Sequence, residues 1–278
     1  MDKRKLGRTG FDVSIIGLGG EGLLHSQGRD KEAYAFINKA LDLGINFFES
    51  ARFYDTNEEY YGKALRERRK DIFLTSKSRV RTKQGALADL QESLRNMKTD
   101  YVDLWQIDDV GDVQTMEQIF TPGGAIEAFI EAKQQGFARF IGIGGNGSPE
   151  IIKQCLERFD FDTMTVPVNP VEASRKSFLE ATMPLAIERN IGVIGMKIYV
   201  RGFTSKLTFF TSMEAFFRYA LSQAIATVII SCDDLAQLEQ NVYFARSIKP
   251  MAWEEQDGFV EAIAPYAEVY YKTDGLAG

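Results

Sequence analysis

An alternation of short apolar strands with amphipathic helices runs through most of this chain and limits the folds that it can adopt. Apolar strands separated by amphipathic helices of about 10–15 residues are typical of a parallel sheet, because each helix crosses back over the sheet. We count eight such strand–helix units within 278 residues. Eight units of this kind fit a closed (β/α)₈ TIM barrel better than an open sheet, so an α/β barrel is the predicted fold.

The predicted elements follow one another through short connections, apart from a loop before the helix that begins at residue 124. The predicted strands cover 13–18, 45–49, 72–76, 101–107, 138–143, 163–168, 192–198 and 227–231. The predicted helices cover 31–43, 57–68, 82–98, 124–135, 148–159, 177–190, 211–223 and 234–247. An N-terminal β-hairpin around Thr9-Gly10 and an extra C-terminal helix near 252–270 complete the prediction. We expect residues 1–278 to form a single barrel domain.

Charge and hydropathy exclude several classes of partner. The net charge is −6 and the basic residues are scattered, so no basic stripe indicates a nucleic-acid partner. No window approaches the ~18 apolar residues of a membrane span, and no apolar run of signal-peptide length follows the basic start. We therefore expect a cytoplasmic protein that binds a small-molecule substrate and contacts no membrane; the sequence leaves its oligomeric state open.

Metal sites are also disfavoured. The two cysteines, Cys155 and Cys232, lie far apart and no metal-ligand pattern surrounds either of them. Because His25 is the sole histidine, a multi-histidine metal site is excluded. We expect neither a metal ion nor an iron–sulfur cluster.

Polar residues at the ends of consecutive predicted strands indicate where the chemistry lies. In a (β/α)₈ barrel the active site is built at the C-terminal ends of the strands. Glu49 and Tyr54 follow the second strand, Lys77 follows the third and Asp108 follows the fourth. Any one of these alone would more often be only a polar residue that caps a strand. Together, two acids, a phenol and an amine predict a catalytic cluster.

The first strand–helix turn is rich in glycine but does not follow a dinucleotide-binding pattern. Its glycines are Gly17, Gly19, Gly20 and Gly22, which do not form the G-x-G-x-x-G motif. A Rossmann phosphate loop is therefore not supported.

The segment from Glu49 to Leu65 resembles the aldo-keto reductases, whose pattern here is D-T-A-x-x-Y-G-x-S-E-E-x-x-G-x-A-L. Every position from Tyr54 to Leu65 is in register with it. Further segments that resemble this family are "KLGRTGFDVSIIGLG", "IFLTSK", "TDYVDLWQI" and "IGVIGMKIYVRG", so the resemblance covers nearly the whole chain. It implies a (β/α)₈ barrel that binds an extended nicotinamide dinucleotide without a Rossmann fold.

The resemblance also implies roles for the clustered residues. Tyr54 would exchange a proton with the substrate oxygen, Lys77 would be its partner, and Glu49 would hold the lysine where the family usually has aspartate. A free tyrosine has a pKa of about 10, and a buried ammonium nearby favours the phenolate. We therefore expect the pKa of Tyr54 to fall toward the working range.

Asp108 departs from the family pattern, because it stands where the family has a histidine that orients the substrate carbonyl. An ionised Asp108 would raise the pKa of the tyrosine and repel a developing oxyanion, whereas a protonated one could donate a hydrogen bond. Asp108 thus indicates an altered substrate class or weakened catalysis. His25, in the first strand–helix loop, is either a replacement for the missing histidine or a solvated loop residue.

The resemblance further implies a set of cofactor contacts. The predicted contacts are Gly20, Asn146, Asn169, Lys197, Arg201, Ser231, Asp233, Gln237 and Asn241. Asn146 follows two glycines that replace the family's Ser-Asn pair, Asn169 is a further partner for the nicotinamide amide, and Asn241 matches an adenine-contacting asparagine. The segment 231–241 contains two aspartates and no cation, so it favours NAD(H) over NADP(H), although Arg201 or Lys206 in the preceding loop could supply charge.

Taken together, these features predict an NAD(P)(H)-dependent oxidoreductase that transfers hydride to or from a small carbonyl, alcohol or activated double bond. Tyr54 would be its general acid or base, with Lys77, Glu49 and Asp108 as the other catalytic residues. The alternative is a catalytically weakened cofactor-binding or redox-sensing protein on the same barrel. A sugar-binding barrel without cofactor is disfavoured, since "LEQN" matches the dinucleotide-contacting helix.

Overall fold

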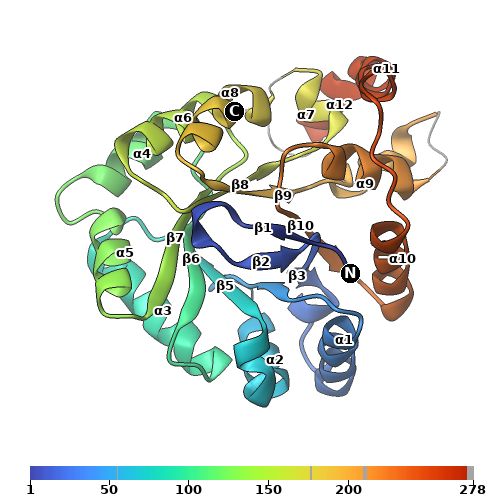
Figure 1. Ribbon diagram of the computed structural model, residues 1–278. Coiled ribbons are helices and arrows are strands. Elements are labelled where there is room, and N and C mark those ends of the chain that lie inside the picture. Colours follow the sequence, from blue (N-terminus) through green and yellow to red (C-terminus); the bar gives the residue numbers. More distant parts are fainter. Residues whose placement is uncertain (55, 176, 209–211, 274–278) are drawn as a thin grey trace.

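The computed structural model of the chain is a closed barrel of parallel strands surrounded by helices (Figure 1). The structure describes residues 1–54, 56–175, 177–208 and 212–273. The strand order around the barrel is β10-β3-β4-β5-β6-β7-β8-β9, and the parallel pairing of β9 with β10 closes the ring. The predicted (β/α)₈ fold is therefore confirmed.

The order of the elements is a regular alternation. The barrel strands are β3 (Ile16–Gly22), β4 (Phe47–Glu49), β5 (Phe73–Ser78), β6 (Val102–Ile107), β7 (Ala138–Gly144), β8 (Thr163–Pro167), β9 (Gly192–Met196) and β10 (Thr227–Cys232). The helices are α1 (Asp30–Asp42), α2 (Asn57–Ala64), α3 (Lys83–Met97), α4 (Val113–Phe120), α5 (Ala125–Gln134), α6 (Pro149–Arg158), α7 (Pro170–Ala173), α8 (Phe178–Glu188), α9 (Met213–Ser222), α10 (Leu235–Arg246), α11 (Trp253–Ile263) and α12 (Ala267–Thr273). Among the described residues, no helix combines the length and the apolar character needed to cross a membrane.

Two short helices occupy positions that the sequence pattern predicts as loops. Helix α4 lies in the predicted loop before residue 124; the Asp112 side chain caps it by accepting a hydrogen bond from the Thr115 amide at 2.7 Å. Helix α7 is a single turn that begins after Asn169. Each is too short for a clear helical periodicity. The predicted start of the helix at residue 211 lies outside the described residues.

A β-hairpin crosses the N-terminal end of the barrel (Figure 1). It consists of the antiparallel strands β1 (Lys3–Lys5) and β2 (Asp12–Ser14). From it, Leu6 packs against Phe47 and Phe73 in an apolar layer that fills the bottom of the barrel interior. The predicted hairpin thus closes one end of the barrel and leaves the other end for a site.

The hairpin approaches the barrel wall so closely that it requires a glycine. Gly7 has a positive φ of 48°, and a Cβ at this position would lie 2.2 Å from the backbone nitrogen of Gly192. Any side chain would therefore push the hairpin away from the start of β9.

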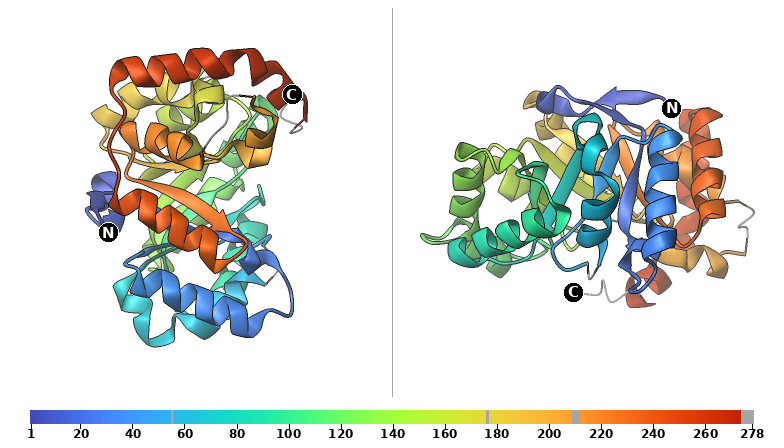
Figure 2. Two further views of the ribbon diagram at one scale, coloured as in Figure 1. Left: turned by 90° about the vertical axis from the view of Figure 1, so that its right-hand side faces the viewer. Right: turned by 90° about the horizontal axis from the view of Figure 1, so that it is seen from below.

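The C-terminal helices α11 and α12 lie along the outside of the barrel beside α7 (Figure 2). Their buried residues, including Ile263 and Tyr270, form a second apolar cluster with Val171 of α7 and with Phe203 in the loop after β9. The C-terminal segment therefore supports two of the loops that reach the C-terminal end of the barrel.

The apolar layer predicts a measurable dependence of stability on the hairpin. Leu6→Ala removes a fully buried side chain, so we expect the free energy of unfolding to fall by about 2–5 kcal/mol in urea denaturation. Ile187→Ala is the control, because this side chain is 70% exposed, and we expect a change within about 0.5 kcal/mol. An unchanged urea midpoint for Leu6→Ala would show that the hairpin does not seal the barrel.

Candidate active site

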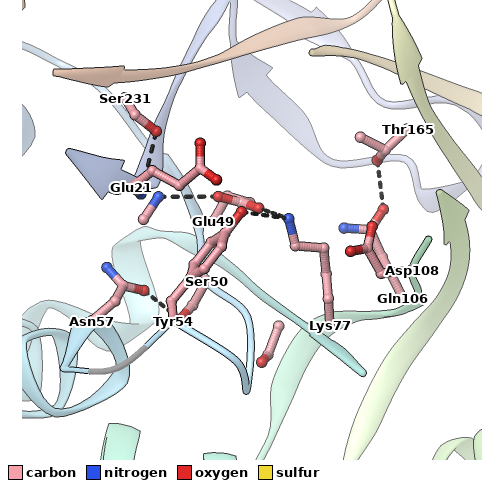
Figure 3. Close-up of polar contacts among 12 residues, drawn as sticks. Glu21, Glu49, Ser50, Tyr54, Asn57, Lys77, Gln106, Asp108, Thr165 and Ser231 are labelled. Carbon is pink, nitrogen blue, oxygen red and sulfur yellow. Dashed lines mark hydrogen bonds and ion pairs between the residues drawn. The ribbon is translucent and has the colours of Figure 1, made fainter. Parts of the chain in front are cut away.

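A cavity of about 450 Å³ contains all four of the predicted catalytic side chains in its lining. They are Glu49, Tyr54, Lys77 and Asp108, and each comes from the C-terminal end of a strand or from the loop that follows it. Figure 3 shows Lys77 reaching toward Glu49 and Tyr54, with Asp108 on its other side. The structure thus brings together residues that are up to 59 positions apart in the sequence.

The strands place Glu49 and Lys77 side by side. Glu49 ends β4, and β4 pairs in parallel with β5, which carries Lys77. Side chains alternate between the two faces of a strand, so Lys77 points to the same side as Phe73, which lies in the interior at the bottom of the barrel. Lys77 therefore enters the barrel interior at its upper end.

The loop after β4 fixes the position of Tyr54. The backbone of Arg52 donates a hydrogen bond to the carbonyl of Lys77 at 3.0 Å, so the chain keeps pairing with β5 beyond Glu49. A turn follows, in which the Tyr54 amide donates to the Ala51 carbonyl at 3.0 Å. This turn directs the phenol back over Lys77.

Lys77 connects the phenol to the carboxylate. Its Nζ donates hydrogen bonds to Glu49 Oε1 and, at 3.2 Å, to the Tyr54 hydroxyl. The backbone amide of Gly20 donates to Glu49 Oε2 at 3.0 Å. A Cβ on Gly20 would lie 2.7 Å from both Asn57 Oδ1 and Tyr54 Cδ2. Gly20, which the sequence assigns to the cofactor, therefore supports Glu49 and leaves room for Tyr54.

The protonation states follow from burial and from the neighbouring charges. Burial is the largest effect on the pKa of Tyr54 and raises it well above its ordinary value; Glu49 raises it further, and Lys77 opposes both. The predicted fall in this pKa is therefore wrong, because burial and the carboxylate outweigh the ammonium. Burial alone would lower the pKa of Lys77, but Glu49, Tyr54 and Asp108 together hold it well above its ordinary value. At neutral pH the phenol keeps its proton and the lysine is charged.

Asp108 is bound by arginines that the sequence reasoning missed. Arg79 Nε donates to Asp108 Oδ2 at 3.2 Å, and Arg81 Nη2 donates to the backbone carbonyls of Asp108 and Asp109 at 2.6 and 2.9 Å. In this geometry the Asp108 side chain accepts a hydrogen bond. Arg79 lies two positions after Lys77, so the alternation of side chains along the strand was a signal that could have found it.

Four of the predicted cofactor contacts also line the cavity. They are Asn146, Lys197, Arg201 and Ser231. Lys197 and Arg201 have positive φ values of 54° and 49°, a strained backbone region for residues with side chains. Strain of this kind clusters at functional sites.

Asn169 is held inside the protein. Its Oδ1 accepts a hydrogen bond from the Glu172 amide at 3.0 Å and so caps α7. Its Nδ2 donates to the Lys197 carbonyl at 3.1 Å. The structure does not place Asn169 among the residues that line the cavity, and its visible role is to tie α7 to the loop that carries Lys197.

The remaining three predicted contacts lie at helix α10. Asn241 is buried; its Oδ1 accepts from the Tyr199 hydroxyl and its Nδ2 donates to the Gln237 carbonyl at 2.7 Å. Asp233 and Gln237 are exposed at the start of the helix, where the Asp233 amide donates to Gln237 Oε1 at 2.9 Å. Tyr199 lines the cavity, so Asn241 reaches the site through its hydrogen bond to this phenol.

His25 lies beside Tyr54. Its ring centroid is 5.7 Å from that of Tyr54, with the two rings tilted by 44°. Within the described ranges, His25 is not among the residues that line the cavity. The structure therefore gives His25 a packing contact with Tyr54 rather than a place in the cavity lining.

The chain resembles known proteins in both sequence and fold. The model of the Aldo/keto reductase family matches residues 15–210. The chain is 30% identical to the uncharacterized oxidoreductase YqkF of Bacillus subtilis over 217 residues, which are 73% of this chain and 66% of that protein. It is also 30% identical to the L-galactose dehydrogenase of Arabidopsis thaliana over 210 residues, 70% of this chain and 64% of that one. The matched segments thus span slightly less than two thirds of these relatives.

A solved structure extends the match to nearly the whole fold. The holo form of the aldo-keto reductase AKR11C1 from Bacillus halodurans superposes with a TM-score of 0.77 at 26% identity and covers 94% of this chain and 96% of its own. The family model covers well over half of the chain, and the closed barrel is the fold of the matched structure. This chain belongs to the aldo-keto reductase family.

Proposed function

We propose that the chain reduces a small carbonyl compound with a reduced nicotinamide dinucleotide and that Tyr54 donates the proton. The observation that carries this proposal is the buried contact of Lys77 with both Glu49 and Tyr54 on the wall of the cavity. A phenol beside a charged amine, in a cavity large enough for a small substrate, is suited to general acid catalysis.

The residues around the cavity fit a nicotinamide dinucleotide. Lys197 and Arg201 carry positive charge, which suits the diphosphate, and Ser231 offers a hydroxyl. Asn146 offers an amide that can pair with the nicotinamide carboxamide. When bound, the reduced nicotinamide supplies a hydride to the carbonyl carbon of the substrate.

The chain's own residues handle the proton. Tyr54 begins the reaction protonated, because burial raises the pKa of its phenol, and the hydroxyl gives its proton to the carbonyl oxygen. Lys77 Nζ, 3.2 Å from that hydroxyl, stabilises the phenolate that is left. Glu49 holds the ammonium in place and is itself held by the Gly20 amide. The raised pKa keeps Tyr54 protonated at neutral pH, which is the state that reduction of a carbonyl requires.

Removal of the Tyr54 hydroxyl separates proton transfer from cofactor binding. For Tyr54→Phe we expect kcat to fall by about 10²- to 10⁴-fold on an aldehyde and ketone panel. The dissociation constant of the cofactor, from fluorescence titration, should stay within about twofold. Tyr34→Phe is the control, because this tyrosine is 55% exposed on α1. Wild-type binding of cofactor without turnover of any carbonyl or enone would favour the cofactor-sensing alternative, and binding of neither NADH nor NADPH would refute both.

The charge of Glu49 predicts the direction in which the Tyr54 titration moves. Glu49 is the second cause that raises the pKa of Tyr54, so Glu49→Gln should lower that pKa. The tyrosinate absorbance of Tyr54 is isolated by subtracting the titration of a matched protein that also carries Tyr54→Phe. In Glu49→Gln this absorbance change should then appear at a lower pH than in wild type. Glu67→Gln, at an exposed glutamate, is the control and should leave the titration in place. A shift to higher pH would contradict the electrostatic reasoning.

The choice between the two dinucleotides rests on the start of α10. Asp234 caps the helix by accepting from the Gln237 amide at 2.8 Å, whereas Asp233 is exposed and its Oδ2 accepts a long hydrogen bond of 3.5 Å from Gln237 Nε2. A carboxylate there repels the 2′-phosphate of NADP(H) and can accept from the ribose hydroxyls of NAD(H). We therefore propose that the chain prefers NAD(H).

Asp233→Lys tests this preference. The substitution replaces a repelling charge by an attracting one, so the ratio of the NADPH to the NADH dissociation constant should fall by at least about 10-fold. Asp71→Lys makes the same change of charge at an exposed position before β5, at the opposite end of the barrel, and should leave the ratio unchanged. If the two variants gave the same ratio of dissociation constants, the 2′-position of the bound cofactor would not lie beside Asp233.

A further inference from the structure

Arg79 extends the active site beyond the residues that handle the proton. It follows β5, two positions after Lys77, and lines the same cavity as Tyr54 and Asp108. Successive side chains on one face of a strand are about 6.5 Å apart. The guanidinium therefore belongs to the same cavity wall as the Tyr54 hydroxyl.

Three neighbours fix the guanidinium of Arg79. Its Nε donates to Asp108 Oδ2 at 3.2 Å and lies 3.8 Å from Asp109 Oδ2. Its Cζ lies 3.7 Å from the centre of the Phe53 ring, and Phe53 in turn packs edge-on against Tyr54. An arginine that is stacked on an aromatic face and bound at one edge loses little further freedom when it binds a ligand.

The other edge of the guanidinium is open. Among the described residues, none accepts a hydrogen bond from Arg79 Nη1 or Nη2, and the side chain is 50% exposed. These two nitrogens form a planar fork that matches the two oxygens of a carboxylate. Asp108 thus acts as a positioning residue, because it engages Nε and leaves the fork directed away from itself.

The nearby acids do not prevent an anion from binding at the fork. A ligand carboxylate would contact the fork directly, whereas Asp108 and Asp109 lie at the Nε edge and are farther away, and Coulomb energies fall with distance. Arg81, whose Nη2 donates to the carbonyls of both aspartates, adds a second positive charge to the cluster.

We propose that Arg79 is a specificity-determining residue that binds a carboxylate of the substrate, so that the cavity selects short oxo acids over neutral carbonyls. The inference rests on the proposed reductase function for its turnover test, but the carboxylate site can also be measured by binding alone. The proposal also gives Asp108 a role. Its carboxylate, at the position where the sequence resemblance places a histidine, holds Arg79 in place.

The test compares an acid with its neutral counterpart. The probes are 4-oxobutanoate and its methyl ester, with kcat and KM measured for wild type, Arg79→Gln and Arg79→Lys. Wild type should prefer the acid, and Arg79→Gln should lower kcat/KM for the acid by about 10- to 100-fold, chiefly through KM, with little change for the ester. For Arg79→Lys, kcat/KM for the acid should lie between the values of wild type and Arg79→Gln, because lysine keeps the charge but lacks the fork of two nitrogens. Equal effects on acid and ester, or no wild-type preference, would overturn the proposal.

A binding measurement separates this proposal from the reductase function. Calorimetric titration with 4-hydroxybutanoate, in the presence of NADH, should give binding to wild type that Arg79→Gln loses. Arg66→Gln removes the same charge from an exposed site near the other end of the barrel and is the control. Arg79-dependent binding without turnover would refute the reductase function and keep the carboxylate site. Turnover of both probes, together with 4-hydroxybutanoate binding that does not depend on Arg79, would refute the carboxylate site and keep the reductase function.

Discussion

The ion pair between Lys77 and Glu49 is the interaction on which the active site depends. Its side chains are only 7% and 2% exposed, and removing a charge from water costs several kcal/mol. Neither charge is tolerable there alone, and loss of one partner of such a pair typically costs about 3–5 kcal/mol. The Gly20 amide and the Tyr54 hydroxyl complete the hydrogen bonds of the pair. The sequence around Gly20 is therefore constrained by a pair of charges that lies on two other strands.

The two ends of the barrel have different roles. At the N-terminal end, the hairpin and a layer of phenylalanines and leucines seal the interior, so this end contributes burial of apolar surface. At the C-terminal end the interior becomes polar, with Glu49, Lys77 and Asp108 at the strand termini. A change at the first end is expected to act on stability, and a change at the second on chemistry or selectivity.

Much of the fold could be predicted from the sequence, because each barrel strand is an apolar run between helices whose periodicity is clear. The cluster of Glu49, Tyr54, Lys77 and Asp108 was predictable too, since strand ends meet at one edge. The pKa of Tyr54 was not, because it depends on how burial balances two opposite charges at particular distances. The hydrogen bonds of Asn169 with Lys197 and of Asn241 with Tyr199 could not be predicted either. Both partners lie in the loop after β9, which only the folded barrel brings near.

The hydrogen bond from the Arg52 amide to the Lys77 carbonyl couples the position of Tyr54 to that of Lys77. The turn that carries Tyr54 is bound to the backbone of the strand that carries Lys77, so a displacement of β5 moves both groups together. Their 3.2 Å contact is thus referred to the backbone of this one strand. A change in a loop after another strand, such as the one that carries Arg201, can then alter what enters the cavity while Tyr54 keeps its alignment with Lys77.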